Sequence, residues 1–374
     1  MRPVITACLL FGVTLLLYGY RLTTAPVTAP EATILRAASA GSAPVFFHVA
    51  DDQWLQPLAV YLAAGVQLVG GGDASARLAS TIAGALNVAL LFVVMRLMVS
   101  RTALALAAAV LLMVTPAHWW QAQLGTDALL PVTFVLLWML AMLRFLQTDS
   151  RLMLALAGLA LGAGVYAHPA APLTMAGLWT ISAASTFATK RLTMATALIY
   201  GASFAAALLP AGVWFASHPE TYADTFGRWA ILKAHVRYPL EGLRAQINWN
   251  TLSNRASIFW GLLDPSFLFF AAPGRAAAPL LLCSLILVPL GAIRAARLAQ
   301  PAHRVLLFAV ALWPPMVAAT FGLRQDLAMV AMLPAAAAIV AAMGLESLPE
   351  RHRAVAWTVA ALVAASVYQL ASLI

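Results

Sequence analysis

The chain has 374 residues, of which 63% are hydrophobic and only 9% are charged, and its mean hydropathy is +0.88. A soluble globular domain carries about 25% charged residues, so this composition excludes a water-soluble fold, whose surface needs more ionisable groups. The formal net charge of +9 does not indicate a nucleic-acid partner, because most basic residues lie in short loops between apolar segments.

Apolar segments separated by charged residues, prolines and glycines predict an all-α polytopic membrane protein. The hydrocarbon core of a bilayer is about 30 Å thick, and an α-helix needs roughly 20 apolar residues to cross it. We expect about eleven transmembrane helices that form a single transmembrane domain over residues 1–374. In chain order the expected spans are 4–20, 76–98, 102–119, 127–146, 151–167, 171–188, 193–216, 276–293, 304–322, 327–344 and 354–373.

Basic residues in short loops determine the expected orientation. The positive-inside rule assigns such loops to the cytoplasm, which places the N-terminus inside and the C-terminus outside. We therefore expect a multi-pass protein of the bacterial cytoplasmic (inner) membrane. The residues that define the cytoplasmic side are Arg2, Arg96, Arg101, Arg144, Arg151, Lys190, Arg191, Arg294, Arg297, Arg304, Arg351 and Arg353.

The outer side has two long loops. The first outer loop, 21–75, contains two helix-like stretches, 30–41 and 55–69, and the first suits an amphipathic helix that lies in the membrane interface. The second large outer loop covers 217–275. All acidic residues of the chain lie on this side except Asp149, Glu346 and Glu350. Any chemistry is therefore expected on the outer side.

An apolar stretch at 258–272 is interrupted by Asp264 and Pro265. It is shorter than a complete span, and a span here would invert the charge bias of every later loop. We therefore expect an interfacial segment on the outer face.

Carboxylates on the outer side are the candidate catalytic groups. They are Glu31, Asp51 and Asp52 on the first outer loop and Asp127 at the outer end of the fourth expected span. A carboxylate at a membrane boundary can act as a general base, hold a metal ion or pair with arginine, and it can also be an ordinary solvated loop residue. Asp127 alternatively fits a helix N-cap, whose side chain accepts hydrogen bonds from free backbone N–H groups.

Basic and aromatic residues alternate over 228–260 and suggest a binding site for the phosphate of a lipid. Arg228, Lys233 and Arg237 are the candidates there, and Arg324 lies at another outer boundary. Arginine and lysine bind phosphate well. The alternative is an aromatic belt with ordinary head-group contacts, or a snorkelling anchor. The spacing of the outer histidines matches no zinc signature, so no metal site is expected from it.

Several motifs resemble, in order, those of the GT-C membrane glycosyltransferases, in the branch of the protein O-mannosyltransferases and aminoarabinose transferases. They are Pro30-Glu31-Ala32 and the stretches 54–62, 76–80, 218–222, 264–269 and 332–334, with Arg324 before the last. The resemblance covers most of the chain.

This resemblance implies a GT-C fold and a transferase that moves a hexose or pentose from a polyprenyl-phosphate donor to an acceptor on the outer face. The first-loop aspartate of the family corresponds to Pro30, which cannot take a proton. Glu31, Asp51 and Asp52 are the candidates on that loop to take its place, while Asp127 corresponds to the second family acid. No cofactor is implied with certainty, and a divalent metal ion is compatible with the resemblance.

The substitution at Pro30 also supports a second hypothesis, in which the chain is a catalytically inactive GT-C-like scaffold subunit of a membrane protein complex. Besides the lipid-linked donor, the expected partners are membrane lipids and, in this second hypothesis, other membrane proteins. A transporter is disfavoured, because the middle of the spans is almost free of charge, whereas transporters place ionisable groups near the midplane.

Overall fold

The structure is a computed structural model, and every structural statement below concerns the residues that it describes. These are 3–20, 22, 27–40, 47–49, 53–99, 101–219, 249–270, 277–298, 300–322, 327–328, 330–346, 358 and 360–365. The elements in chain order are α1 (Pro3–Gly19), α2 (Ala29–Ser39), β1 (Phe47–Val49), β2 (Gln53–Leu55), α3 (Pro57–Leu68), η2 (Gly72–Ala74), α4 (Ser75–Met98), α5 (Thr102–Met113), α6 (Pro116–Gln123), α7 (Leu130–Thr148), α8 (Arg151–Gly164), α9 (Ala171–Ala188), α10 (Met194–Ser217), α13 (Trp249–Leu262), α14 (Pro265–Phe269), α15 (Ser284–Ala296), α16 (Pro301–Thr320) and α17 (Leu333–Glu346).

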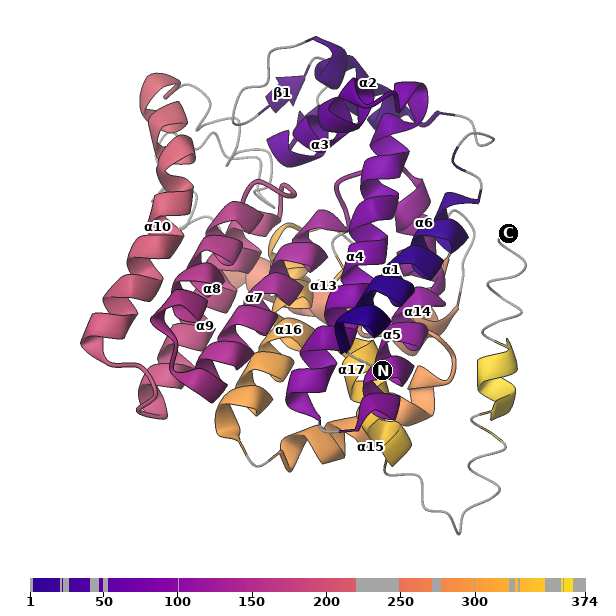
Figure 1. The fold of residues 1–374 in the computed structure, drawn as a ribbon, viewed down its shortest axis with the longest axis vertical. Coiled ribbons are helices and arrows are strands. Elements are labelled where there is room, and N and C mark those ends of the chain that lie inside the picture. Colours follow the sequence, from indigo (N-terminus) through magenta and orange to yellow (C-terminus); the bar gives the residue numbers. More distant parts are fainter. Residues whose placement is uncertain are drawn as a thin grey trace.

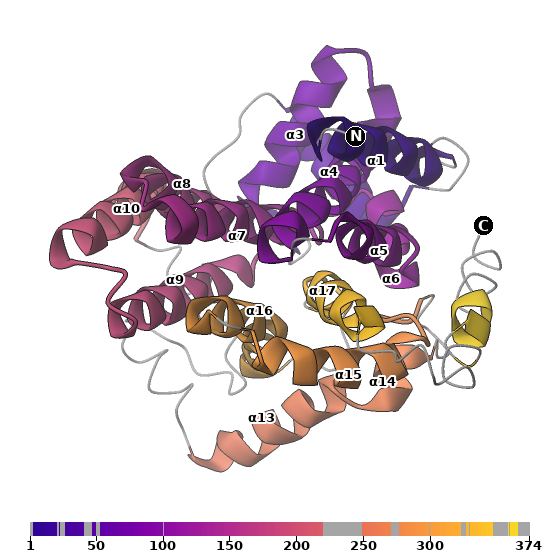
Figure 2. The same ribbon diagram turned by 60° about the horizontal axis from the view of Figure 1, so that its bottom comes forward.

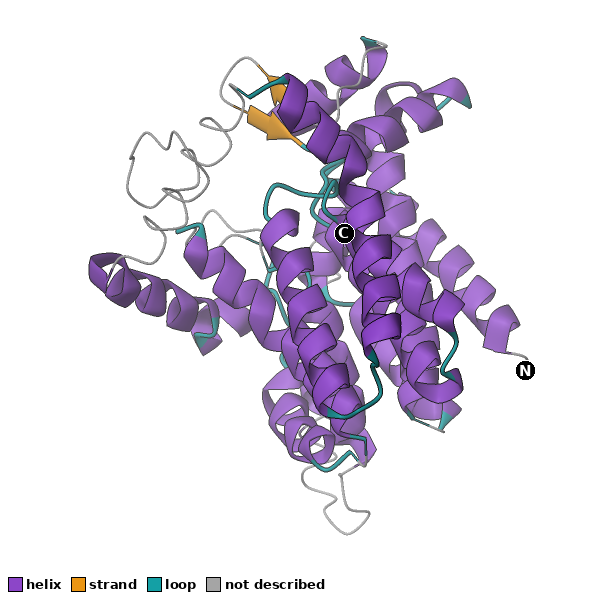
Figure 3. Cartoon of the chain, turned by 90° about the vertical axis from the view of Figure 1, so that its left-hand side faces the viewer, coloured by secondary structure: helices purple, strands orange, loops and turns teal. Residues whose placement is uncertain are grey.

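Helices make up most of the described structure, which confirms the expected helical fold (Figure 1). Helices occupy each expected span from 4–20 to 327–344, while the span 354–373 lies largely outside the described residues. One element was not expected: β1 and β2 pair antiparallel, with Phe47 opposite Leu55, beside α2 and α3 (Figure 3). Strands of three residues are too short to produce an alternating pattern in the sequence.

Four helical segments in the described part are long and apolar enough to cross a membrane on their own. They are Gly72–Met98, Leu130–Thr148, Met194–Ser217 and Pro301–Thr320, and α5 with α6 adds a fifth if this pair, bent by 56°, forms one span. Helices α8, α15 and α17 have only 14, 13 and 14 residues, fewer than the roughly 20 that a crossing needs. The number of eleven spans therefore stays a prediction.

The two ends of the helix bundle differ in composition. Helices α2 and α3 lie at the top in Figure 1, and the basic loops lie at the opposite end. There Glu346, the last residue of α17, lies 3.4 Å from Arg101 and 3.1 Å from Arg294. On neighbouring loops, Arg191 lies 3.3 Å from Asp149. The fold thus brings separate basic loops to one end, as the expected topology requires. That this end faces the cytoplasm stays a prediction.

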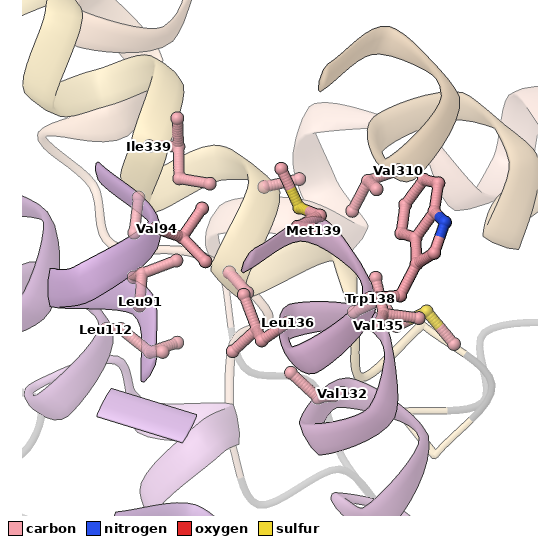
Figure 4. Close-up of a cluster of buried hydrophobic side chains, with 14 of the residues drawn as sticks. Leu91, Val94, Leu112, Val132, Val135, Leu136, Trp138, Met139, Val310 and Ile339 are labelled. Carbon is pink, nitrogen blue, oxygen red and sulfur yellow. The ribbon is translucent and has the colours of Figure 1, made fainter. Parts of the chain in front are cut away.

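Helix α4 lies at the centre of the N-terminal half and packs against α1, α3, α5, α6 and α7. Figure 4 shows the apolar core that these helices share with the C-terminal half: Leu91 of α4, Leu112 of α5, Leu136 of α7, Val310 of α16 and Ile339 of α17. All five side chains are buried. Because lipid tails are as apolar as these side chains, close van der Waals packing rather than the hydrophobic effect holds such helices together.

Helix α17 is buried along almost its whole length, from Leu333 to Gly344. It packs against α15, α5 and α16, which lie around it in Figure 2. The approach to α15 is closest at Gly291 and Gly344. A Cβ added to Gly291 would overlap the carbonyl oxygen of Val340, and one added to Gly344 would overlap that of Leu287. Small residues therefore determine the contact between these two helices.

Replacing Gly291 with leucine is expected to destabilise the protein by about 1–3 kcal/mol, because the side chain has no space unless α15 and α17 separate. Thermal unfolding in detergent measures the effect. Gly212→Leu on α10 is the matched control, since a Cβ at Gly212 meets nothing within 4 Å. Equal unfolding temperatures for the two variants would contradict the close packing of α15 on α17.

The expected interfacial stretch forms two helices, α13 and α14, that separate at Asp264 and Pro265. The Ser266 backbone N–H donates to Asp264 Oδ1 at 2.8 Å, and this bond holds the pKa of the carboxyl below its usual value. Phe267 and Ile258 are buried in a cluster that includes Val317 of α16. The break in this segment is therefore where the sequence predicts it, and its position at the interface stays a prediction.

Candidate active site

Glu31 forms a buried ion pair with Arg77. Arg77 Nε lies 2.7 Å from Glu31 Oε1, and Nη2 donates to Oε2 at 2.8 Å. The Glu31 side chain is 0% exposed and the Arg77 side chain is 5% exposed. This bidentate contact joins α2, on the first loop, to the start of α4. Arg77 lies 46 residues after Glu31 in the chain. A guanidinium matches a carboxylate in this geometry, and each charge neutralises the other where water is excluded.

The same carboxylate also fixes the first turn of α2. Thr28 is the N-cap: its side chain accepts from the Glu31 N–H, and its own N–H donates to Glu31 Oε2 at 3.2 Å. This reciprocal arrangement is a capping box. Arg77 Nη1 donates to the Leu22 carbonyl at 3.0 Å, so the arginine also holds the chain that follows α1. Glu31 and Arg77 together fix the first loop onto the helix bundle.

The loop between α6 and α7 packs directly against Glu31. Gly125 has φ +62°, which favours glycine, and a Cβ there would lie 3.1 Å from Glu31 Cδ. Ser80 Oγ of α4 donates to the Thr126 carbonyl at 2.6 Å. Asp127 is the next residue along this loop. The structure therefore brings the loops that carry Glu31 and Asp127 to one place, although they are far apart in the sequence.

Asp127 keeps contact with the surface, since its side chain is 18% exposed. Its Oδ1 lies 3.9 Å from Nε2 of His168. This histidine is on the loop between α8 and α9, and its side chain is 8% exposed. The Ala170 N–H donates to His168 Nδ1 at 3.1 Å, so in the neutral ring the proton is on Nε2, which faces Asp127. The alternative of an N-cap at Asp127 is wrong: α7 begins at Leu130 with Leu129 as its N-cap, without a side-chain cap bond.

Buried polar side chains form hydrogen bonds between the helices next to the Asp127 loop. Tyr18 of α1 donates to the Met113 carbonyl, and its hydroxyl lies 2.9 Å from His118 Nδ1. Asn87 of α4 donates to the Leu129 carbonyl at 3.2 Å and accepts from Thr133 at 2.7 Å. These bonds fix the helix ends on both sides of the Asp127 loop and so position the loop.

Several predicted site residues lie outside the described residues. They are Asp51 and Asp52 of the first loop and the phosphate-binding candidates Arg228, Lys233, Arg237 and Arg324. Among the residues that the structure describes, no three histidine, cysteine or acidic side chains lie close enough together to hold a metal ion. Within that part of the chain, the site therefore consists of one buried ion pair and one partly exposed carboxylate beside a histidine.

Sequence reasoning did not identify Arg77 and His168 as parts of the site. Arg77 appeared only as a member of a short motif, although an arginine at the start of an apolar span needs a partner. The preceding loop carries four acids, Glu31, Asp51, Asp52 and Asp73, so the sequence alone did not single out the partner of Arg77. The approach of His168 to Asp127 depends on the packing of α7, α8 and α9, which no local pattern reveals.

Comparison with known proteins identifies the fold. Residues 56–214 match the family model described as dolichyl-phosphate-mannose-protein mannosyltransferase. The apo crystal structure of the Archaeoglobus fulgidus oligosaccharyltransferase superposes with a TM-score of 0.54 at 14% identity, over 99% of this chain and 55% of that chain. The resemblance to the GT-C membrane glycosyltransferases is thereby confirmed.

A second structure gives the same GT-C fold. It is the archaeal oligosaccharyltransferase AglB from Archaeoglobus fulgidus, in complex with an inhibitory peptide and a dolichol-phosphate, with a TM-score of 0.52 and 14% identity over 98% of this chain. The chain spans about half the length of these archaeal proteins, 55% in each case. No curated protein sequence matches the chain significantly. The match to the family model runs from α3 into α10 and thus includes Arg77, Asp127 and His168, while Glu31 lies before its first residue.

Proposed function

We propose that this GT-C chain is a membrane glycosyltransferase that moves a sugar from a polyprenyl-phosphate donor to an acceptor on the outer face of a bacterial inner membrane. The observation that carries the proposal is the convergence of Glu31 and Asp127. The two loops that carry these acids meet at the end of the bundle opposite the basic loops. The complex of AglB with dolichol-phosphate supports a lipid-linked donor for this fold.

In the proposed mechanism, Asp127 is the general base. Its carboxylate takes the proton of the acceptor hydroxyl while that oxygen bonds to the anomeric carbon. The bond from this carbon to the donor oxygen breaks, and the lipid phosphate leaves with the electron pair, so that the configuration is inverted. Asp127 fits this role because its side chain is partly exposed and its Oδ1 lies 3.9 Å from the Nε2 of a histidine.

Glu31 is assigned a positioning role. Its carboxylate is fully buried and held by Arg77, so a substrate hydroxyl does not reach it in this arrangement. We propose that Arg228, Lys233, Arg237 and Arg324 stabilise the negative charge on the departing phosphate, as arginine and lysine do in phosphate sites. Asp51 and Asp52 remain the second candidates for a base on the first loop.

Sugar transfer is tested with the purified chain in proteoliposomes that contain a polyprenyl-phosphate donor with a radiolabelled sugar, together with an extract of membrane acceptors. We expect the lipid-linked label to be consumed and to appear on an acceptor. The alternative is a catalytically inactive scaffold in a membrane complex. Absence of consumption, together with membrane proteins that co-purify in mild detergent, would favour the scaffold and overturn the transferase.

The proposed orientation predicts opposite labelling of two engineered cysteines. Asp73→Cys, beside α3, is expected to react with a membrane-impermeant maleimide added outside intact cells, whereas Thr148→Cys, at the end of α7, reacts only after the membrane is opened. Both positions are exposed in the structure. Replacing Cys8 and Cys283 with serine first removes the background. The reverse result would place the acids inside the cell and contradict the proposed reaction side.

A further inference from the structure

An apolar groove of about 540 Å³ opens on the outside of the bundle, far along the chain from both acids. It lies mainly on α16, with Ile181 of α9 and Ala296 of α15 at its edges. The lining is almost entirely apolar, and Arg304 is the charged residue in it. A groove of this kind is suited to a molecule with a long hydrocarbon chain and a single polar end.

The groove is one face of α16. Arg304, Phe308, Leu312 and Met316 follow one another at intervals of four residues, so they form a stripe along the helix. With a rise of 1.5 Å per residue, this stripe is about 18 Å long. One leaflet contributes about 15 Å to a hydrocarbon core about 30 Å thick. The groove therefore has the depth of one leaflet, and Arg304 marks its head-group end.

Trp313 forms a fixed wall of the groove. Its Nε1 donates to the carbonyl oxygens of Leu173 and Thr174 on α9, at 3.3 and 3.2 Å. A Cβ added to Gly177 would overlap the indole ring, so the glycine lets the ring approach α9 closely. The groove is therefore built into the packing of α9 on α16.

The charge at the groove mouth is positive. Arg304 Nη1 donates to the Ala296 carbonyl at 3.1 Å, which holds the guanidinium over the loop between α15 and α16. A guanidinium has five N–H donors, and in the described part of the chain the structure assigns one of them to this carbonyl. Arg297, on the same loop, is exposed. A phosphate at the membrane surface would complement both charges.

We propose that this groove binds an anionic phospholipid from the leaflet on the basic side of the protein. One acyl chain lies along Val305, Phe308, Leu312 and Met316, and the phosphate contacts Arg304. This lipid is separate from the sugar donor, whose site lies at the opposite end of the bundle. The proposal therefore does not depend on the transferase activity.

Native mass spectrometry of the delipidated full-length chain, mixed with equimolar phosphatidylglycerol and phosphatidylcholine, tests the site. We expect wild type to retain phosphatidylglycerol severalfold more than phosphatidylcholine. Arg304→Gln should lower this ratio to one, while Arg304→Lys should keep most of it. Arg144→Gln, an exposed arginine at the same end, is the matched control and should behave as wild type.

A photoreactive group on the acyl chain of phosphatidylglycerol provides a second measurement that requires no substitution. We expect the label on peptides that contain residues 305–316. Equal retention of both lipids by wild type, equal effects of Arg304→Gln and Arg144→Gln, or label confined to other helices would each overturn the proposal. The last result would include the case in which another segment of this chain fills the groove.

Discussion

Replacing Asp127 with asparagine is expected to reduce sugar transfer by about 10²–10⁴-fold, the contribution of a positioned general base. The amide keeps the size of the side chain but cannot accept the proton of the acceptor. Its environment is unchanged, so the unfolding temperature should stay close to that of wild type. Initial rates of label transfer in proteoliposomes, at saturating donor, measure the effect.

The matched control for this experiment is Asp149→Asn. Asp149 is also an acid at a helix end, and its side chain is 67% exposed beside Arg191, but it lies at the basic end of the bundle. This variant should retain full activity. If Asp127→Asn kept wild-type rates while Asp51→Asn or Asp52→Asn abolished transfer, the base would belong to the first loop, and the assignment to Asp127 would be wrong.

Replacing Arg77 with alanine is expected to lower the free energy of unfolding by about 3–5 kcal/mol, because a carboxylate then stays buried without its partner. Glu31→Ala should cost a similar amount, since it also removes the capping box with Thr28. Thermal unfolding of the purified variants in detergent measures both losses. Sugar transfer is lost with the folded first loop in these variants.

Two further variants distinguish the effect of breaking this ion pair on stability from the effect of removing any charged side chain. Arg101→Ala removes an arginine that is 69% exposed and contacts Glu346, and a surface pair of this kind contributes at most about 1 kcal/mol. The double variant Glu31→Gln with Arg77→Met leaves no buried charge and should recover part of the stability. Glu31→Gln and Arg77→Met are also measured singly, and additive losses in the double variant would show that the two side chains do not act as a pair.

The sequence predicts the helices well because the bilayer imposes a simple requirement on them. The segments 4–20, 76–98 and 171–188 coincide closely with α1, α4 and α9, since apolar length alone defines a span. The bend between α5 and α6 was missed, although Pro116 at the start of α6 lacks the N–H that would continue α5. Apolar composition hides such breaks inside a long hydrophobic stretch.

The site was predictable only in part. Glu31 and Asp127 were selected as acids on outer loops, and their loops do meet. Their different environments were not predictable, because the burial of Glu31 depends on Arg77 and the exposure of Asp127 depends on how α7 begins. The two acids therefore have different roles in the proposed mechanism: Asp127 is the proposed base, and Glu31 positions the loop.

The burial of α17 has a consequence for biosynthesis. This helix is made late, after α5 and α15, yet it ends up between them and is covered along its length. The space between α5 and α15 must therefore stay accessible until α17 has been synthesised. Its many alanines and Gly344 are small residues, so the helix is narrow and can enter this space without displacing larger side chains. We expect a bulky substitution on α17 to impair assembly of the newly made protein more than it lowers the stability of the folded protein.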